Sequence, residues 1–282
     1  MIVDLHTHST ASDGSDPPER LVELAARAGL GAMALTDHDT QEGVESAEGT
    51  AAALGVELIP GVELSLAYDT GGMHLVVLWL EPGAGPLQDR LGGLQSGRHL
   101  RNTEILASLE ALGMKITEQE VSAEAGGGSV GRPHIAAVMM TKGYVPDIRT
   151  AFDLWLGAGR PAYVSRERLD PITAIGLARE SGGVPILAHP HTLGITTADA
   201  RARLLGELAD AGLVGLEAIY SSYHRHVRDG YADLARRFGL AVSGGSDYHG
   251  TYKPGLQLGS GYGDLVVPGS ILDDLRSRAV LV

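Results

Sequence analysis

The sequence predicts an α/β fold in which parallel β/α units close into a barrel, interrupted by a helical segment. Several short apolar runs rich in β-formers each lead into a segment with helical spacing, the pattern of parallel β/α units. The helical segments end near a glycine, a common helix stop. The region from residue 81 to residue 160 breaks this alternation, because no β-rich run interrupts it.

The expected barrel elements alternate along the chain. The β-rich runs cover residues 2–5, 32–36, 56–62, 184–188, 214–219 and 240–243. The helical segments cover residues 17–28, 41–54, 172–181, 198–211 and 225–238. A chain of 282 residues suits one barrel with an insertion, since β/α barrels of roughly 250 residues are common.

The irregular region is interpreted as a helical insertion. Glycine and proline residues at 81–86 precede a long polar helical stretch at 87–112, and further helical patterns cover 133–142 and 147–156. We assign residues 1–95 and 161–282 to the barrel and residues 96–160 to the insertion. A long Ω-loop is the alternative interpretation.

Composition narrows the possible partners. Apolar residues make up 44% of the chain and charged residues 20%, as in ordinary globular proteins. The net charge of −13 opposes binding to a long nucleic acid duplex, so a nucleic acid partner would be short and held locally. Without cysteines, a metal ion must be held by His, Asp and Glu. No signal peptide or apolar span is apparent, so we expect a cytoplasmic protein without a membrane partner.

Polar side chains gather where the expected strands end, which is where α/β barrels build their active sites. His6 and His8 follow the first strand, and being two residues apart they share one face of the chain. His74 lies at the start of the apolar run 75–80 and reaches the same rim if that run is a hairpin return. The candidate ligands are His6, His8, Asp13, His38, Glu63, His74, His189, Asp247 and His249.

These candidates are too many for a single ion, which takes about four to six ligands, so they suggest two or three ions with a carboxylate such as Glu63 as a bridge. A bridged cluster suits hydrolysis of a phosphate ester. The alternative is that the histidines cap strands and bond loop carbonyls.

Five motifs, in order along nearly the whole chain, resemble those of the polymerase and histidinol phosphatase (PHP) superfamily of metal-dependent phosphoesterases. They are His6-Thr7-His8-Ser9, Thr36-Asp37-His38-Asp39, Pro60-Gly61-Val62-Glu63, Ala188-His189-Pro190 and Gly245-Ser246-Asp247-Tyr248-His249. The resemblance implies a distorted (β/α)₇ TIM-like barrel that holds up to three divalent ions, often Mn²⁺, Fe²⁺ or Zn²⁺.

The resemblance also implies a ligand set for each ion. One ion would take His6, His8, Glu63 and Asp247. A second would share Glu63 and use His74 and His189, and a third would use Asp13, His38 and His249. Many family members have histidine where this chain has Asp13. With aspartate at this position, the chain resembles one branch of the family. This branch also carries a helical insertion with a Gly-Arg-Pro-His segment, found here as Gly131-Arg132-Pro133-His134.

The insertion motif has the chemistry of a phosphate clamp. Arg132 offers a planar fork for a phosphate, and His134 adds a donor. Lys253, Tyr220 and His224 are further candidate substrate contacts. The alternative for Arg132 is a surface arginine beside a helix N-terminus.

The other polar residues have secondary roles in this interpretation. Arg98 and Arg101 are expected to be solvated helix charges, and His99 and His226 surface residues. His191, Asp37 and Asp39 are expected to orient ligand imidazoles or close the loop. Glu217 could bond either a loop backbone or the substrate, and the sequence does not choose.

The expected activity is hydrolysis of small phosphate monoesters. Asp247, His249, Arg132 and His134 are the candidate catalytic residues, the first two beside the ions and the others neutralising phosphoryl charge. The branch that has aspartate at position 13 and carries this insertion resembles phosphatases of nucleoside 3′,5′-bisphosphates and enzymes that trim short RNA from the 5′ end. The alternatives are a phosphatase of another metabolite, such as histidinol phosphate, and a non-catalytic phosphate-sensing scaffold.

Overall fold

The computed structural model describes residues 1–69, 71–126 and 128–279. One seven-stranded sheet runs in sequence order from β1 to β7. Its strands are β1 (Ile2–Asp4), β2 (Leu30–Leu35), β3 (Glu57–Leu66), β4 (Met73–Leu78), β5 (Val184–Ala188), β6 (Gly215–Tyr220) and β7 (Ala241–Gly245). All six strands expected from the β-rich runs are present, with ends shifted by a few residues.

The sheet curls into a nearly closed barrel, which confirms the predicted fold class. The N–H of Leu5 donates to the carbonyl of Gly244 at 3.2 Å, and that of Asp247 donates to the carbonyl of His6 at 2.9 Å, joining the first strand to the last. The distortion comes from β4, which runs antiparallel to both β3 and β5. It is the hairpin return considered for residues 75–80, and it pairs His74 with Ser65 and Ala188.

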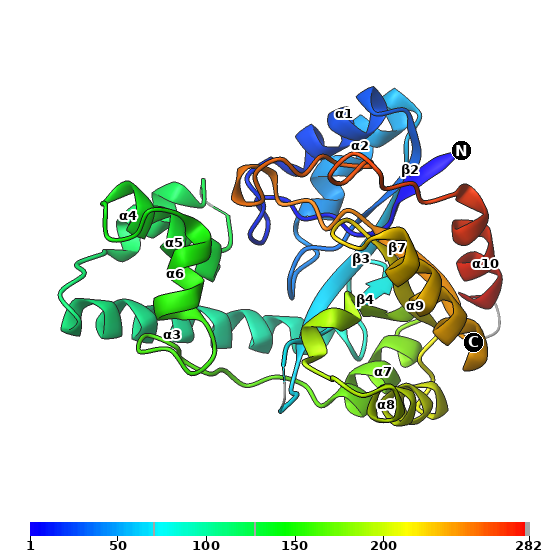
Figure 1. The fold of residues 1–282 in the computed structure, drawn as a ribbon. Coiled ribbons are helices and arrows are strands. Elements are labelled where there is room, and N and C mark those ends of the chain that lie inside the picture. Colours follow the sequence, from blue (N-terminus) through cyan, green and yellow to red (C-terminus); the bar gives the residue numbers. More distant parts are fainter. Residues whose placement is uncertain (70, 127, 280–282) are drawn as a thin grey trace.

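Helices cover the outside of the barrel (Figure 1). They are α1 (Pro18–Arg27), α2 (Gly43–Leu54), α7 (Pro171–Glu180), α8 (Ala198–Asp210), α9 (Arg225–Arg237) and α10 (Gly269–Ala279). Helix α10 was not predicted. Its apolar residues Leu272 and Leu275 are fully buried against the barrel core beside Val267.

The insertion is helical, as expected, and has its own hydrophobic core. It contains α3 (Gln88–Ala111), α4 (Glu118–Glu124), α5 (Arg132–Thr141), α6 (Ile148–Ala151) and a π-helical turn at Phe152–Leu156. Its core joins residues from Ile105 to Ala162. Helix α4 was missed, although Thr117 and Glu120 form a capping box at its start. The predicted boundary at residues 95 and 96 lies within α3, and the division into domains stays a prediction.

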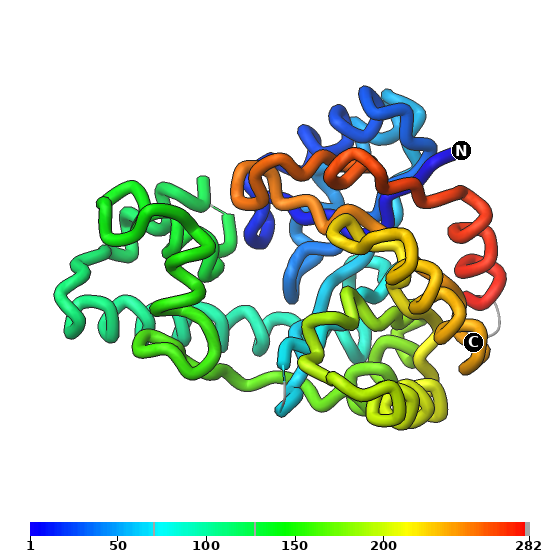
Figure 2. The backbone as a smooth tube through the Cα atoms, in the orientation of Figure 1, coloured from blue at the N-terminus to red at the C-terminus, as the bar shows by residue number. Residues whose placement is uncertain are grey.

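The insertion leaves the barrel along α3, and α4, α5 and α6 lie beside the outer part of that helix (Figure 2). Side chains join it to the barrel. Asp39 of the barrel pairs with Arg98 of α3 at 2.8 Å, and the hydroxyl of Tyr252 donates to Glu124 at the end of α4 at 3.1 Å. In the described part of the chain, no helix is long and apolar enough to cross a membrane.

Candidate active site and metal centre

The nine candidate ligands come together at one end of the barrel. We call them the ligand cluster. Ring–ring and ion-pair distances connect them all: His6, His8, Asp13, His38, Glu63, His74, His189, Asp247 and His249. Most members follow the carboxyl ends of their strands, as the sequence predicts. His74 joins them from the start of β4, because that strand runs in the opposite direction.

Glu63 is the centre of the cluster, and its two oxygens face different histidines. Oε1 lies 2.8 Å from Nδ1 of His74 and 2.9 Å from Nε2 of His189. Oε2 lies 3.1 Å from Nε2 of His8 and 3.3 Å from Nε2 of His6. A carboxylate placed in this way can bridge two ions.

The two carboxylate oxygens of Asp247 also have different partners. Oδ1 lies 3.3 Å from His8 Nε2 and 3.6 Å from His6 Nε2, facing the same space as Glu63. Oδ2 accepts a hydrogen bond from the hydroxyl of Tyr220 at 2.7 Å and forms an ion pair with Lys253. Tyr220 and Lys253 therefore hold one oxygen and leave the other free for an ion.

Asp13 lies beside three histidines of the cluster. Its Oδ1 lies 3.3 Å from His249 Nε2 and 3.8 Å from His8 Nδ1, and its Oδ2 lies 3.8 Å from His38 Nε2. In the described residues, three sets of ligand atoms lie close enough to hold one ion each. They are His8, Asp13, His38 and His249; His6, His8, Glu63 and Asp247; and His38, Glu63 and His74.

Two of these sets differ from the assignment implied by the family resemblance. His38 falls in the third set as well as the first, because its Nδ1 lies 3.2 Å from Glu63 while its Nε2 faces Asp13. His189 falls outside all three sets, yet its Nε2 contacts Glu63 at 2.9 Å. The assignment of residues to individual ions stays a proposal.

The donor atoms fit divalent metal ions. In the described residues, Nε2 of His6, both ring nitrogens of His8 and Nδ1 of His38 are buried without a hydrogen-bond partner. Buried polar atoms nearly always have a partner, so these rings indicate a bound ion that accepts the lone pair of one nitrogen of each imidazole. Imidazole and carboxylate ligands without thiolate suit Zn²⁺, Mn²⁺ and Fe²⁺.

The electrostatics of the cluster favour cations. Burial alone would raise the pKa of Glu63, but His38, His6 and His74 hold it well below its usual range. The pKa of Asp247 is also lowered well below its usual range against the effect of burial, chiefly by Lys253 and His6. Both carboxylates stay ionised and available as ligands.

Three residues at the site have a strained backbone. Positive φ angles occur at Asp39 (57°), His189 (23°) and Asp247 (55°). Non-glycine residues avoid this region at a cost of about 1–3 kcal/mol each. The surrounding contacts therefore fix these side chains in position at the expense of local backbone energy.

A small pocket of about 190 Å³ opens beside the ligand cluster, and we call it the arginine pocket. It shares Asp13, His38 and His74 with the cluster. Its basic lining residues are Arg98, Arg101, Arg132, Arg166 and Arg168. The expectation that Arg98 and Arg101 are solvated is wrong, because each is only 6% exposed. They point from α3 toward the barrel and not into solvent.

The arginines have different partners. Asp39 pairs with Arg98 at 2.8 Å and with Arg166 at 2.6 Å. Arg132 donates to the carbonyl of Leu156 at 3.2 Å and lies over the ring of Phe152. In the described residues, neither Arg132 nor Arg101 has an ion-pair partner.

These unpaired arginines favour an anion. Burial, with Arg168 nearby, lowers the pKa of Arg132 to about 10. Burial and Arg98 lower the pKa of Arg101 to about 8. Guanidinium groups keep their proton in proteins, and the carboxylates of Asp13 and Asp39 face five arginines, so the arginine pocket holds an excess of positive charge that a bound anion would balance.

Comparison with known proteins identifies the family. Residues 4–106 match the PHP domain. The chain is 32% identical to the 3′,5′-nucleoside bisphosphate phosphatase of Chromobacterium violaceum over 91% of its own length and 90% of the relative. It is 36% identical to a 5′-3′ exoribonuclease of Haemophilus influenzae over 87% and 89% of the two chains. The chain belongs to the PHP family of metal-dependent phosphoesterases.

A solved structure agrees with this assignment. A protein from Bifidobacterium adolescentis that has been assigned as a metal-dependent phosphoesterase superposes on 98% of this chain and 96% of its own, with a TM-score of 0.85 and 26% identity. The barrel and the insertion therefore both have counterparts in that structure.

Two carboxylates outside the ligand cluster of this PHP enzyme hold its residues and the first loop in position by hydrogen bonds. Glu217 accepts a hydrogen bond from the backbone N–H of His189 at 2.7 Å, and its other oxygen lies 3.0 Å from Nδ1 of His6. This settles the alternatives for Glu217, since it bonds a loop backbone and a candidate ligand. Asp37 accepts from the Ser9 hydroxyl at 2.6 Å and so closes the first loop, as expected.

The substrate contacts predicted for the PHP enzyme differ in their placement. His134 is fully buried and accepts from the backbone N–H of Gly131 through Nδ1 at 2.9 Å, while its Nε2 has no hydrogen-bond partner among the described residues. Tyr220 and Lys253 both bind Asp247. His224 is exposed at the start of α9, and its ring lies beside His226. The described contacts of His224 do not reach the ligand cluster.

Arg166 and Arg168 were missed by the sequence analysis. They follow the insertion in the segment Ser165-Arg166-Glu167-Arg168 and reach the arginine pocket beside Phe152. The sequence pattern that could have indicated them is a pair of arginines at the point where the chain returns to the barrel after the insertion. No local pattern shows that such a pair faces a site across the fold.

Proposed function

We propose that this PHP phosphoesterase hydrolyses small phosphate monoesters that carry a second phosphate, above all the 3′-phosphate of nucleoside 3′,5′-bisphosphates. The observation that carries the proposal is the position of the arginine pocket next to the ligand cluster, with Asp13, His38 and His74 common to both. One phosphate would lie at the ligand cluster while the arginines hold the other. The bisphosphate phosphatase of C. violaceum supports this choice of substrate.

The residues of the cluster have defined roles in this proposal. His6, His8, Glu63 and Asp247 would hold one ion, Glu63 with His74 and His189 a second, and Asp13, His38 and His249 a third. When bound, divalent ions such as Mn²⁺, Fe²⁺ or Zn²⁺ supply Lewis-acid activation of water and neutralise charge on the reacting phosphate.

The remaining groups bind and orient the substrate. Arg132 and Arg101 donate to oxygens of the second phosphate, because they lack ion-pair partners of their own in the described structure. Arg98 and Arg166 are held by Asp39 and shape the wall of the pocket. The free Nε2 of His134 is available to a phosphoryl or leaving oxygen.

Trimming of short RNA from its 5′ end is the second candidate activity. The H. influenzae exoribonuclease supports it, since the alignment covers both chains almost completely. The net charge of −13 favours a short oligonucleotide over a long duplex in this case.

A substrate panel tests the proposal. Phosphate release is measured with Mn²⁺ for a nucleoside 3′,5′-bisphosphate, a 3′-monophosphate, a 5′-phosphorylated trinucleotide and histidinol phosphate, and then with a chelator. The proposal expects the bisphosphate to have the highest kcat/KM and chelation to abolish release. Preference for histidinol phosphate would replace the proposed substrate. Failure to hydrolyse any phosphoester, with metal bound, would favour a phosphate-sensing scaffold.

A further inference from the structure

The arginine pocket carries more positive charge than one phosphate group balances. Its five arginines face the two carboxylates of Asp13 and Asp39, which leaves an excess of three positive charges among the described residues. A phosphate monoester carries about −1.5 to −2 charges at pH 7, so about one positive charge stays unbalanced. A terminal diphosphate group carries about one negative charge more and matches the excess.

The size of the arginine pocket also exceeds one phosphate group. Its volume is about 190 Å³, which gives room for roughly six water-sized groups at about 30 Å³ each. A terminal phosphate group brings three oxygen atoms beyond its ester oxygen, and a terminal diphosphate group brings six. One phosphate group therefore occupies only about half of the pocket.

Three arginines of the pocket have no carboxylate partner in the described structure. They are Arg101, Arg132 and Arg168, since Asp39 pairs with the other two. Nε of Arg168 is also buried without a hydrogen-bond partner among the described residues. Buried donors nearly always have a partner, so a ligand that accepts a hydrogen bond from Arg168 is expected.

Arg132 is the neighbour of both other unpaired arginines. Burial and, among the nearby charges, chiefly Arg168 lower the pKa of Arg132 to about 10. Burial, Arg98 and Arg132 lower the pKa of Arg101 to about 8. Arg168 is partly exposed, whereas Arg101 is 6% exposed, so Arg168 lies nearer the surface. An anion that extends from Arg101 past Arg132 to Arg168 would offset the repulsion among all three.

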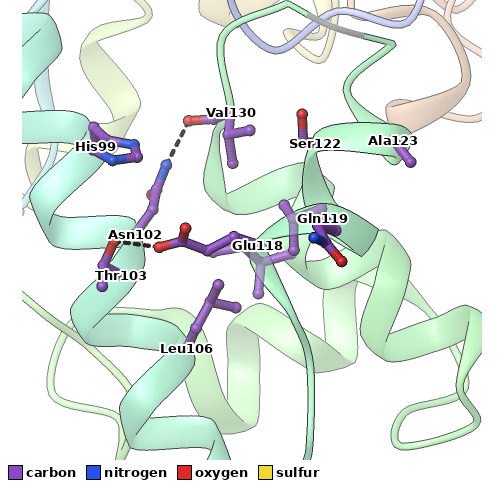
Figure 3. A pocket seen from close by; sticks show the side chains of 11 residues that line it. His99, Asn102, Thr103, Leu106, Glu118, Gln119, Ser122, Ala123 and Val130 are labelled. Atoms are coloured by element: carbon purple, nitrogen blue, oxygen red, sulfur yellow. Dashed lines mark hydrogen bonds between the residues drawn. The ribbon is translucent and has the colours of Figure 1, made fainter.

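Two of these arginines are fixed before a ligand binds. Arg101 donates to Oδ1 of Asn102 through Nη2 at 2.7 Å and through Nε at 3.3 Å. Nδ2 of Asn102 donates in turn to the carbonyl of Val130 at 2.7 Å, as a dashed line in Figure 3 shows. Arg132 donates to the carbonyl of Leu156. Little conformational freedom is therefore lost when these guanidinium groups bind an anion.

We propose that the arginine pocket binds a terminal 5′-diphosphate group, with Arg101 and Arg132 on the inner phosphate and Arg168 on the outer one. The substrate is then a nucleoside 3′-phosphate 5′-diphosphate or a short RNA with a 5′-diphosphate end, since both present the same group. This inference deepens the proposed function and rests on it, because the phosphate removed at the ligand cluster is still the 3′-phosphate or the first phosphodiester.

The first test compares pairs of substrates in the presence of Mn²⁺. A nucleoside 3′,5′-bisphosphate is compared with the corresponding 3′-phosphate 5′-diphosphate, and a 5′-monophosphorylated trinucleotide with its 5′-diphosphorylated form. In at least one pair, kcat/KM should be at least about tenfold higher for the diphosphate, the value of one hydrogen bond to a charged group. The pair with the larger advantage identifies the source of the group. No advantage in either pair would overturn the proposal.

Variants of Arg168 locate the diphosphate in the pocket. Arg168→Ala should reduce the advantage to less than about twofold. Arg168→Lys should recover part of it, because lysine keeps the charge but not the planar fork. Arg160→Ala is the matched control and should keep the wild-type advantage, since Arg160 is exposed in the same returning segment outside the lining. An advantage that Arg168→Ala leaves intact would overturn the proposal, because the ligand cluster would then bind the outer phosphate.

A binding experiment separates this inference from the proposed function. The metal-loaded full chain is titrated calorimetrically with adenosine 5′-monophosphate and adenosine 5′-diphosphate, without free metal ions in solution. The diphosphate should bind at least about tenfold more tightly, and Arg168→Ala should remove the difference. If no nucleotide were hydrolysed, the proposed function would fail, and this titration would still decide the diphosphate site. If the bisphosphate were hydrolysed but both adenosine nucleotides bound equally, only the diphosphate site would be overturned.

Discussion

Replacement of Arg132 by alanine separates recognition of the second phosphate from the reaction itself. Arg132 is held by the carbonyl of Leu156 at 3.2 Å and lies over Phe152, so its guanidinium is positioned before substrate binds. The Arg132 side chain therefore loses little conformational freedom when the substrate binds. The effect of Arg132→Ala then comes mainly from the lost contacts to the phosphate. A hydrogen bond to a charged group contributes about 1.5–3 kcal/mol, which corresponds to a loss of about 10- to 100-fold.

The assay compares two substrates in the presence of Mn²⁺. For Arg132→Ala, kcat/KM should fall about 10- to 100-fold for a nucleoside 3′,5′-bisphosphate and only slightly for the 3′-monophosphate. Arg132→Lys should recover part of the loss, because lysine keeps the charge but not the planar fork. Arg149→Ala is the matched control, since the Arg149 side chain lies in the insertion and is 91% exposed. Equal losses for both substrates would refute this role of Arg132.

Three further predictions concern the residues around the arginine pocket and the ligand cluster. Tyr220→Phe should weaken metal binding about 10- to 100-fold with the fold intact, because Oδ2 of Asp247 loses its hydroxyl donor; unchanged metal content under competing chelator would contradict this role. Asp39→Asn should destabilise the enzyme by about 3–5 kcal/mol in chemical denaturation at pH 7, since Arg98 and Arg166 lose their buried counterion. Burial opposes ionisation of Asp39, but Arg98 and Arg166 lower its pKa to about 2, so the stability difference between wild type and variant should be largest above the unfolded pKa of 3.8 and should shrink as pH falls toward 2; a difference that stays constant between pH 7 and pH 2 would contradict the account. His8→Ala should abolish turnover and reduce bound metal measured by elemental analysis, because His8 contacts both Glu63 and Asp247; full activity and metal content would refute the site map.

The ligand cluster could be predicted from the sequence because a barrel brings the carboxyl ends of its parallel strands to one rim. His6, His8 and His189 all follow apolar β-rich runs, so their meeting follows from topology alone. His74 required more, since it reaches the rim only because β4 is antiparallel. The sequence shows the apolar run but does not indicate whether the strand is parallel or antiparallel to its neighbours.

The arginine pocket could not be predicted in the same way. Arg98 and Arg101 lie on a polar helix, and a polar face looks the same in the sequence whether it meets water or a charged pocket. Only the tertiary contact of Arg98 with Asp39 distinguishes the two cases. Arg166 and Arg168 lie outside any motif and reach the pocket through the path of the returning chain.

The ratio of kcat/KM for a nucleoside 3′,5′-bisphosphate to that for the corresponding 3′-monophosphate, measured for the wild type with Mn²⁺, tests the central claim most directly. The two substrates differ only in the phosphate assigned to the arginine pocket. The account predicts a ratio of at least about ten, equivalent to one hydrogen bond between Arg132 and that phosphate. A ratio near one, with both substrates hydrolysed, would contradict it.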